Sequence, residues 1–374
     1  MKDKFKFVTL FPNCPNYGLV KDVGQIPYVL GREYEDVESE LVSAQIELDG
    51  ENIEEVKGLK LTKIKYIVND FVTGALFIMK HAKEIDCLNI YHAGRKTYYW
   101  NKIYKKCNPS GKTYLKLDLD YNSCEIYESE RKARSLFKKV TESMDIVSVE
   151  SNTVLEKIKK YTNKQIMLIT NGYCKSNNIV EAKLPRINTF LTVGRLGTKQ
   201  KATDVLLQAF AKSSNRHDWT LELIGAISLD FQSYIDDYYN YYPELKERVI
   251  FKGVINQRDE LYNKYSQSKV FVLPSRWESF ALVGPEALSC GCRLIISDAV
   301  ASKDDVTRYG KYGQIIPVND VESLANAMVA ESLKNISNDE RREMCDYAEQ
   351  VFSWENICKK IYFSIDGYKK IYNL

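Results

Sequence analysis

The stretch VFVLPSRWESFALVGPEALSCGCRLII, residues 270–296, alternates strand and helix signals. Its apolar start, residues 270–273, runs into a Pro-Ser turn and is typical of a buried parallel strand. Pro285 is tolerated only in the first turn of a helix, where its missing N–H has no intrahelical partner, and Gly291 is typical of a helix end. Because a second apolar run follows, the stretch predicts one strand–helix–strand unit of a parallel sheet.

Two carboxylates flank the start of this helix. Glu278 and Glu286 have seven residues between them, and Pro285 places the helix start near Ala281 or Leu282. Backbone amides at a helix start have no intrahelical partner and bind anions, whereas carboxylates accept hydrogen bonds from hydroxyl groups. The amides concerned belong to Ser279, Phe280 and Ala281. The pattern therefore predicts a ligand that carries both phosphate and hydroxyl groups.

A second motif, TFLTVGRLGTKQKATDVLLQAF at residues 189–210, combines a glycine with two cations. Gly194 ends an apolar run and lets the backbone approach a ligand, and Arg195 and Lys201 supply positive charge. Guanidinium and ammonium groups beside a glycine turn suit a diphosphate. The alternative is that both cations only solvate a loop, but the two glutamates downstream favour the diphosphate.

Length and composition indicate two domains. At 374 residues the chain exceeds the usual size of one hydrophobic core, and 44% hydrophobic with 28% charged residues is typical of soluble globular proteins. Alternating strand and helix signals predict a doubly wound α/β domain on each side of a polar linker at 174–188. We place an N-terminal domain at 1–180, a C-terminal domain at 181–350 and, at 351–374, a helix that returns to the N-terminal domain.

Charge and cysteine content restrict the partners and the compartment. The net charge of +3 gives no argument for a nucleic-acid partner. Nine cysteines without a C-x-x-C pair are typical of reduced packing residues, and no apolar run has the length of a membrane span. We therefore expect a cytoplasmic protein.

One helical segment, residues 125–140, has a basic face. Its cations are Arg131, Lys132, Arg134, Lys138 and Lys139. Such a face predicts either peripheral contact with anionic lipid at the inner face of the cell membrane or an ordinary solvated surface.

The motifs of the second domain resemble a known family. VGRLGTKQKATDVLLQAF, the LELIGA strand, FKGV and FVLPSRWESFALVGPEALSCGCRLIISD resemble the C-terminal half of retaining glycosyltransferases of the family 4 type, with their E-x7-E motif. The resemblance covers residues 188–329 and the closing segment FSWENICKKIY, and it is weak over the first domain. It implies the GT-B fold, in which two doubly wound, Rossmann-like domains face each other across a cleft. The N-terminal domain would then lie on the acceptor side and the C-terminal domain would bind a nucleotide sugar.

The resemblance also implies roles for individual residues. Arg195 and Lys201 would hold the donor diphosphate, Glu286 would bind the ribose hydroxyls, and Glu278 would bind the transferred sugar. The implied donor-binding residues are Gly18, Gly194, Arg195, Lys201, Gly253, Val254, Ser279, Phe280, Ala281, Leu282 and Glu286. The implied catalytic residues are Glu278, Lys201, Arg195 and Asp118.

The first domain departs from the family pattern. Gly18 lies in the loop after the first strand, but the paired glycines often found there are absent. Where the family often has a histidine after a central strand, this chain has KLDLD with Asp118 and Asp120, and His92 ends another strand. Asp118 and Asp120 also form a D-x-D pattern, whose oxygens suit Mn²⁺ or Mg²⁺ in the other large glycosyltransferase fold. The GT-B features favour a metal-independent site.

The sequence thus predicts a retaining glycosyltransferase that moves a sugar from a nucleotide sugar to a saccharide or lipid-linked saccharide acceptor. The donor would be a UDP- or GDP-sugar, no other cofactor is expected, and the setting would be bacterial surface polysaccharide or glycoconjugate synthesis. Two alternatives stay open. One is a glycoside hydrolase with Glu278 and Glu286 as acid and base. The other is a nucleotide-sugar sensor or inactive partner subunit.

Overall fold

The chain divides into two compact units. A computed structural model describes residues 4–174 and 185–372; unit 1 comprises residues 1–172 and 352–374, and unit 2 comprises 173–351. Most of the predicted linker, residues 175–184, lies outside the described residues. The C-terminal helix α14 (Trp354–Tyr372) belongs to unit 1, where it packs on α1 (Asp22–Glu33).

Unit 1 is built on a parallel sheet. In its described residues seven strands have the order β3-β2-β1-β4-β5-β6-β7. The strands are β1 (Phe5–Leu10), β2 (Val37–Ser43), β3 (Lys60–Lys63), β4 (Cys87–Tyr91), β5 (Lys112–Lys116), β6 (Ile146–Val149) and β7 (Met167–Leu168). Parallel neighbours need crossover connections, and these supply the covering helices.

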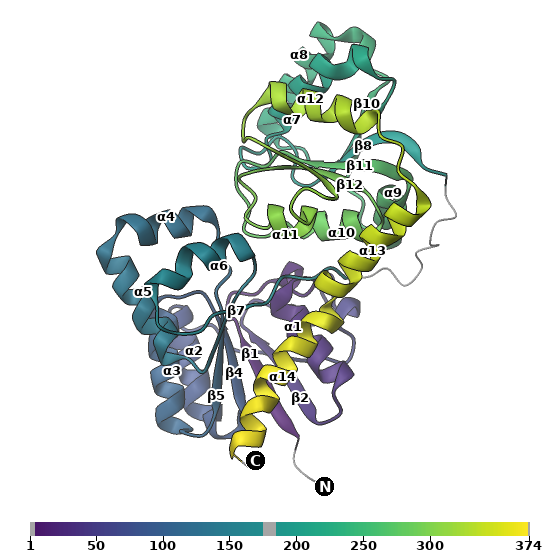
Figure 1. Cartoon of the computed structure of the whole chain (residues 1–374). Helices are drawn as coiled ribbons and strands as arrows, with labels where there is room; N and C mark the ends of the chain where they lie inside the picture. Colours follow the sequence, from purple (N-terminus) through teal and green to yellow (C-terminus); the bar gives the residue numbers. More distant parts are fainter. Residues whose placement is uncertain (1–3, 175–184, 373–374) are drawn as a thin grey trace. The chain divides into compact units, whose positions relative to one another are not determined.

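Helices cover both faces of this sheet. Helices α1 and α14 lie on one face, and α2, α3 and α5 lie on the other (Figure 1). The remaining bounds are α2 (Asp70–His81), α3 (Arg95–Cys107), α4 (Tyr121–Ser129), α5 (Arg131–Ser143) and α6 (Asn152–Ile158). This arrangement follows from right-handed crossovers, because the strand order reverses between β1 and β4.

Unit 2 repeats the plan. Its described residues form a six-stranded parallel sheet in the order β10-β9-β8-β11-β12-β13. The strands are β8 (Ile187–Val193), β9 (Thr220–Ile224), β10 (Val249–Gly253), β11 (Ser268–Leu273), β12 (Arg293–Ser297) and β13 (Gly313–Ile316). The helices are α7 (Thr203–Ser213), α8 (Gln232–Tyr241), α9 (Arg258–Gln267), α10 (Val283–Ser289), α11 (Lys303–Thr307), α12 (Val321–Ser332) and α13 (Asn338–Phe352).

Both sheets confirm the predicted α/β class with two doubly wound, Rossmann-like domains. In each sheet the first strand lies beside the fourth, so the order reverses between β1 and β4 and between β8 and β11. Ligands of open α/β sheets bind at the carboxyl ends of the strands at such a switch point. The loops after β8 and β11, which carry the two sequence motifs, meet at that point in unit 2. The facing of the two domains across a cleft stays a prediction.

Two local predictions for unit 1 are wrong. The KLDLD segment was predicted as a strand end, but β5 ends at Lys116 because Asp118 adopts a left-handed conformation with φ of 47°. The single helix predicted at 125–140 is two helices, α4 and α5, because Glu130 between them is extended, with φ of −106° and ψ of 109°.

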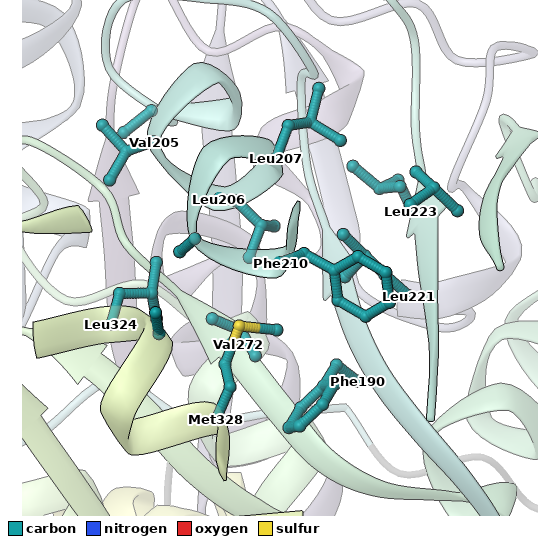
Figure 2. Close-up of a cluster of buried hydrophobic side chains, with 14 of the residues drawn as sticks. Phe190, Val205, Leu206, Leu207, Phe210, Leu221, Leu223, Val272, Leu324 and Met328 are labelled. Atoms are coloured by element: carbon teal, nitrogen blue, oxygen red, sulfur yellow. The ribbon is translucent and has the colours of Figure 1, made fainter. Parts of the chain in front are cut away.

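Helices α7 and α12 supply much of the hydrophobic core of unit 2 on the face of the sheet shown in Figure 2. Helix α7 supplies Leu206 and Phe210, and α12 supplies Leu324 and Met328. These side chains pack onto strand residues of the sheet, among them Phe190, Leu221 and Val272 (Figure 2). The core therefore holds α7 against the sheet, and with it the loop that precedes α7.

No helix in the described part of the chain has the length and apolar character needed to span a bilayer.

Replacing Phe210 with alanine tests this core. Phe210 is fully buried and its ring lies 5.4 Å from the Arg248 guanidinium. We expect Phe210→Ala to lower the free energy of unfolding of unit 2 by about 3–5 kcal/mol, through lost burial and the cavity left behind. Urea unfolding followed by circular dichroism measures it. The control Tyr241→Ala, at a side chain 83% exposed, should change it by less than about 0.5 kcal/mol; equal effects would contradict the assignment.

Candidate functional site

A short ion pair joins the two loops at the switch point of unit 2. Lys201, in the loop after β8, places Nζ 2.5 Å from Oε1 of Glu278, in the loop after β11. The hydroxyl of Ser275 donates to the same carboxylate oxygen at 3.1 Å. Both charged side chains are largely buried, so the contact is a charge-assisted bond with little screening by solvent. The structure thus brings together two of the predicted site residues.

Backbone contacts reinforce this junction. The Arg276 amide donates to the Gln200 carbonyl at 2.7 Å, and the Arg276 guanidinium donates to the Lys199 carbonyl at 2.8 Å. Arg276 also pairs with Asp204 of α7 at 2.7 Å. The Gln200 side-chain amide donates to the Trp277 carbonyl at 3.0 Å. Sequence reasoning missed Arg276 and Gln200, although Arg276 lies within the PSRWE motif.

Arg195 lies at the exposed end of the same loop. Its guanidinium donates to Oε1 of Gln200 at 3.2 Å, so it reaches the junction through one intermediate side chain. Unlike Lys201, it forms no ion pair among the described residues. An exposed guanidinium beside a neutralised ammonium leaves Arg195 available to bind an anion.

Glycines end three neighbouring strands of this sheet. They are Gly194 after β8, Gly225 after β9 and Gly253 at the end of β10. A Cβ at Gly225 would lie 1.8 Å from the Gly194 carbonyl oxygen, so no larger residue fits there. At Gly253, with φ of 71°, the space around a Cβ is open, and Val254 beside it is exposed. Three neighbouring strands therefore end in residues without side chains at the carboxyl edge of the sheet. The sequence motifs did not predict a role for Gly225.

Two alanines in these loops have left-handed backbone conformations. Ala202, next to Lys201, has φ of 50°, and Ala281 has φ of 62°. Such a conformation costs a non-glycine residue about 1–2 kcal/mol and persists only where the surroundings impose it. Ala202 caps α7, and Ala281 turns the chain into α10, which begins at Val283 with Leu282 as its N-cap. The predicted helix start is thus correct to within two residues.

The segment before α10 is held through its carbonyl groups. The Glu278 carbonyl accepts from the Ala301 amide at 3.0 Å, and the Ser302 hydroxyl donates to the carbonyl of the buried Phe280. Among the described residues, the backbone N–H groups of Ser279 and Ala281 form no hydrogen bond. These are two of the amides that the sequence predicted as anion donors.

Glu286 is anchored apart from the ion pair. It lies in the first turn of α10, and the Tyr265 hydroxyl of α9 donates to its Oε2 at 3.0 Å. Burial raises the pKa of Glu286, while the positive charge of Arg258 and the Tyr265 hydrogen bond oppose that rise. The two glutamates of the E-x7-E spacing therefore have different partners, a lysine for Glu278 and a tyrosine for Glu286.

The predicted residues of unit 1 gather around its own switch point. Gly18 follows β1, and a Cβ there would lie 2.5 Å from the Cys14 sulfur, so the loop packs tightly at this position. His92 and Asp118 follow the neighbouring strands β4 and β5, both with positive φ, of 64° and 47°. Asp120 is the N-cap of α4 and accepts from the Ser123 amide at 2.9 Å. The two aspartates of the D-x-D pattern thus have different surroundings.

Comparison with known proteins supports a glycosyltransferase. Residues 187–331 match the model of the family "Glycosyl transferases group 1". An uncharacterised 41.2 kDa protein of the cps region of Klebsiella pneumoniae is 28% identical over 207 residues, 55% of this chain and 49% of that protein. The O-antigen chain mannosyltransferase B of Escherichia coli is 25% identical over 277 residues, 67% of this chain and 68% of that protein. The chain spans about half the length of the curated relatives that it matches first.

Solved structures share the fold over nearly the whole chain. The lipopolysaccharide outer core galactosyltransferase WaaB superposes with a TM-score of 0.73 at 16% identity, covering 97% of this chain and 99% of WaaB. Anabaena Alr3699/HepE in complex with UDP and glucose gives a TM-score of 0.69 at 14% identity, covering 97% and 100% of the two chains. Residues 187–331 are therefore similar to the glycosyl transferases group 1 family, and the two-domain Rossmann-like fold of this chain is one that solved glycosyltransferases share.

Proposed function

We propose that this chain is a retaining, metal-independent glycosyltransferase that moves a sugar from a nucleotide sugar to a saccharide or lipid-linked saccharide acceptor. The observation that carries the proposal is the Lys201–Glu278 pair at the switch point of unit 2. It places a cation and a carboxylate beside a strand edge without side chains, with the exposed Arg195 next to them. This combination suits a ligand with a diphosphate and a sugar.

The proposed chemistry concerns the charge of the leaving group. As the glycosidic bond breaks, negative charge develops on the departing nucleoside diphosphate. Arg195 and Lys201 would stabilise this charge more strongly in the transition state than in the ground state, which lowers the barrier. The amides of Ser279 and Ala281 add donors to the same side. The acceptor hydroxyl would attack from the face that the diphosphate leaves, with a diphosphate oxygen taking its proton, so that the configuration is retained.

The relatives support the donor and acceptor classes. The solved Anabaena neighbour is in complex with UDP and glucose, so we propose a UDP- or GDP-sugar donor bound along Gly194, Gly253 and Val254, with Glu286 on the ribose. One relative is named for O-antigen chains and another lies in a cps region, which supports a role in bacterial surface polysaccharide synthesis. A matching galactosyltransferase named for a GlcNAc-diphosphoundecaprenol substrate supports a lipid-linked acceptor.

The arrangement of the glutamates disfavours glycoside hydrolysis. A hydrolase needs one carboxyl as acid and one as base or nucleophile on either side of the bond. Here Lys201 neutralises Glu278, and Tyr265 donates a hydrogen bond to Glu286. The acid and base mechanism of a hydrolase also does not require an exposed cation such as Arg195. A nucleotide-sugar sensor would bind the donor at the same site without turnover. An assay of nucleoside diphosphate release therefore distinguishes a sensor from a transferase.

An exposed helical face of unit 1 supports contact with a membrane. Helices α2, α3 and α5 lie side by side on one face of the sheet (Figure 1). Leu76, Met79 and Tyr99 are exposed on α2 and α3, and Lys102 of α3 and Lys139 of α5 both lie over the Tyr98 ring, at 5.1 and 4.8 Å. Apolar side chains among lysines suit an anionic bilayer surface. We therefore propose a cytoplasmic protein bound peripherally at the inner face of the cell membrane.

Arg134, one of the cations predicted for the basic face of segment 125–140, also has a structural contact. The Arg134 guanidinium donates to the carbonyl groups of Tyr127 and Glu128 at the end of α4, at 3.0 and 2.6 Å. These bonds satisfy carbonyl groups at the C-terminal end of α4, so Arg134 caps this helix.

Two glutamate variants test the donor site. We expect Glu286→Ala to raise the Kd for UDP or GDP by roughly 10–100-fold, because about 1.5–3 kcal/mol of charge-assisted hydrogen bonding is lost. Glu278→Gln should lower turnover by about 100-fold while changing that Kd by less than about threefold. Titration calorimetry with the nucleoside diphosphates and assays of their release from a UDP- and GDP-sugar panel measure both.

The matched control is Glu322→Gln, an exposed glutamate of α12, which should change neither quantity. Release of the nucleoside diphosphate that requires an acceptor supports transfer. Release of the nucleoside diphosphate with water alone would support hydrolysis. Binding without any release would make the chain a sensor, and equal effects of the Glu278 and Glu286 variants would contradict their separate roles.

Vesicle flotation tests the membrane contact. The protein should float with vesicles that contain phosphatidylglycerol but not with pure phosphatidylcholine, and raising the salt should release it because screening weakens the attraction of lysines to the surface. Met79→Glu should reduce the bound fraction several-fold. The control Leu229→Glu, at an exposed leucine of unit 2, should not. Binding that depends on neither charge nor Met79 would refute the proposed face.

A further inference from the structure

Three strand ends of unit 1 are tied together beside the residues predicted for its site. The His92 amide donates to the Lys116 carbonyl, and the Leu117 amide donates to the Ser148 carbonyl, each at 3.0 Å. These contacts join the ends of β4, β5 and β6. The two residues just beyond, His92 and Asp118, both have left-handed backbone conformations. Such conformations persist in non-glycine residues only where the surrounding structure holds them.

A single buried carboxylate holds the turn after β5. Glu150 follows β6, and its Oε1 accepts from the Asp118 amide at 2.8 Å while its Oε2 accepts from the Leu119 amide at 3.2 Å. Its side chain is 1% exposed. Two consecutive backbone N–H groups donate to the two oxygens of one carboxyl, which is a geometrically specific arrangement. Burial raises the pKa of Glu150, and the positive charge of Lys116 opposes that rise. Glu150 is thus hydrogen-bonded to the turn that contains the left-handed Asp118.

A buried lysine compensates this carboxylate. The Lys116 side chain is 0% exposed, and its Nζ lies 3.2 Å from Glu150 Oε1 and 3.3 Å from the Ile169 carbonyl oxygen. Asp22 of α1 and Asp118 add further negative charge around Lys116. Burial raises the pKa of Asp22 to about 7, against the opposing charge of Lys116.

Stability alone does not explain this ion pair. Buried ion pairs are often no more stabilising than apolar residues of the same volume, because both charges lose their hydration. An apolar pair could fill the space but could not accept hydrogen bonds from the two amides of the turn. The specific effect of the pair is thus the conformation of residues 117–119.

The turn presents one of its two aspartates. Asp120 is bonded to the Ser123 amide and hydroxyl as the cap of α4, whereas the Asp118 side chain remains partly exposed at the carboxyl edge of the sheet. We propose that Glu150 is a positioning residue that, neutralised by Lys116, holds the Asp118 carboxylate in place for the transfer reaction. The inference rests on the proposed transferase function.

A double-mutant cycle tests the inference on the full-length protein. Turnover is read as nucleoside diphosphate release from the UDP- or GDP-sugar that most raises the melting temperature, with octyl glycosides of mannose, galactose and N-acetylglucosamine as acceptors. Glu150→Gln should lower kcat at least tenfold and leave the Kd for the nucleoside diphosphate within twofold. Asp118→Asn should lower kcat similarly, and the double variant should fall no further, because Glu150 acts through Asp118.

A second buried ion pair provides the matched control. Arg293 and Glu331 are 7% and 0% exposed with a shortest N–O distance of 2.6 Å, and Arg293 begins β12 at the amino edge of its sheet. Glu331→Gln should lower the melting temperature as Glu150→Gln does, with kcat per folded molecule unchanged. If Glu150→Gln does not fold, Glu150→Asp keeps the charge but withdraws the carboxyl by one methylene, and the same kcat loss is expected.

Hydrogen exchange gives a readout that does not depend on activity. The Asp118 and Leu119 amides should exchange at least tenfold faster in Glu150→Gln than in wild type. Absence of acceptor-dependent release by the wild type would contradict the proposed function, whereas these exchange rates would still report the turn. Two results would overturn the positioning role. The first is an active wild type and a Glu150→Gln variant whose kcat lies within twofold of it. The second is a double variant whose loss of kcat equals the product of the two single-variant losses.

Discussion

The contact between Lys201 and Glu278 connects the two halves of the unit-2 sheet at the place where its strand order reverses. A parallel sheet that reverses leaves its two central loops diverging, and a charge-assisted bond of 2.5 Å between them closes that gap. Because each loop leads directly into a helix packed on the sheet, the position of the pair is set by the hydrophobic core. The packing of Leu206 and Phe210 is therefore also what aligns the candidate donor site.

Left-handed residues recur at the candidate sites of both units. Ala202 and Ala281 adjoin the Lys201–Glu278 junction, and His92 and Asp118 end adjacent strands of unit 1. None of them is glycine, so each conformation costs free energy that the neighbouring contacts must offset. In unit 1 the offsetting contact is visible as the Glu150 carboxylate beneath the turn. Each unit thus has a largely buried ion pair at the carboxyl edge of its sheet. Lys201–Glu278 lies at the switch point of unit 2, and Lys116–Glu150 lies at the ends of β5 and β6 in unit 1.

Sequence patterns predicted the elements whose signals are local. The stretch 270–296 predicted its strands, its helix start and its glycine stop, because proline and glycine restrict the backbone directly. Strand β2 has the sequence VESELVS, which lacks an apolar run and does not predict a buried strand. Its Glu40 is buried because Lys6 and Lys60, from neighbouring segments, lie within 3.5 Å of the carboxylate. Such compensation depends on residues brought together by folding and has no signal in the segment itself.

By itself the sequence determined the α/β class, the motif-bearing loops of unit 2 and the residue types available for a phosphate and a sugar, because periodicity, turns and motif spacing are properties of contiguous residues. Only the tertiary structure decided which charges meet. It paired Glu278 with Lys201 from 77 positions away and placed Glu150 under a turn 32 positions earlier, while Asp120 became a helix cap. Long-range electrostatics depends on distance in space, and the fold alone sets that distance.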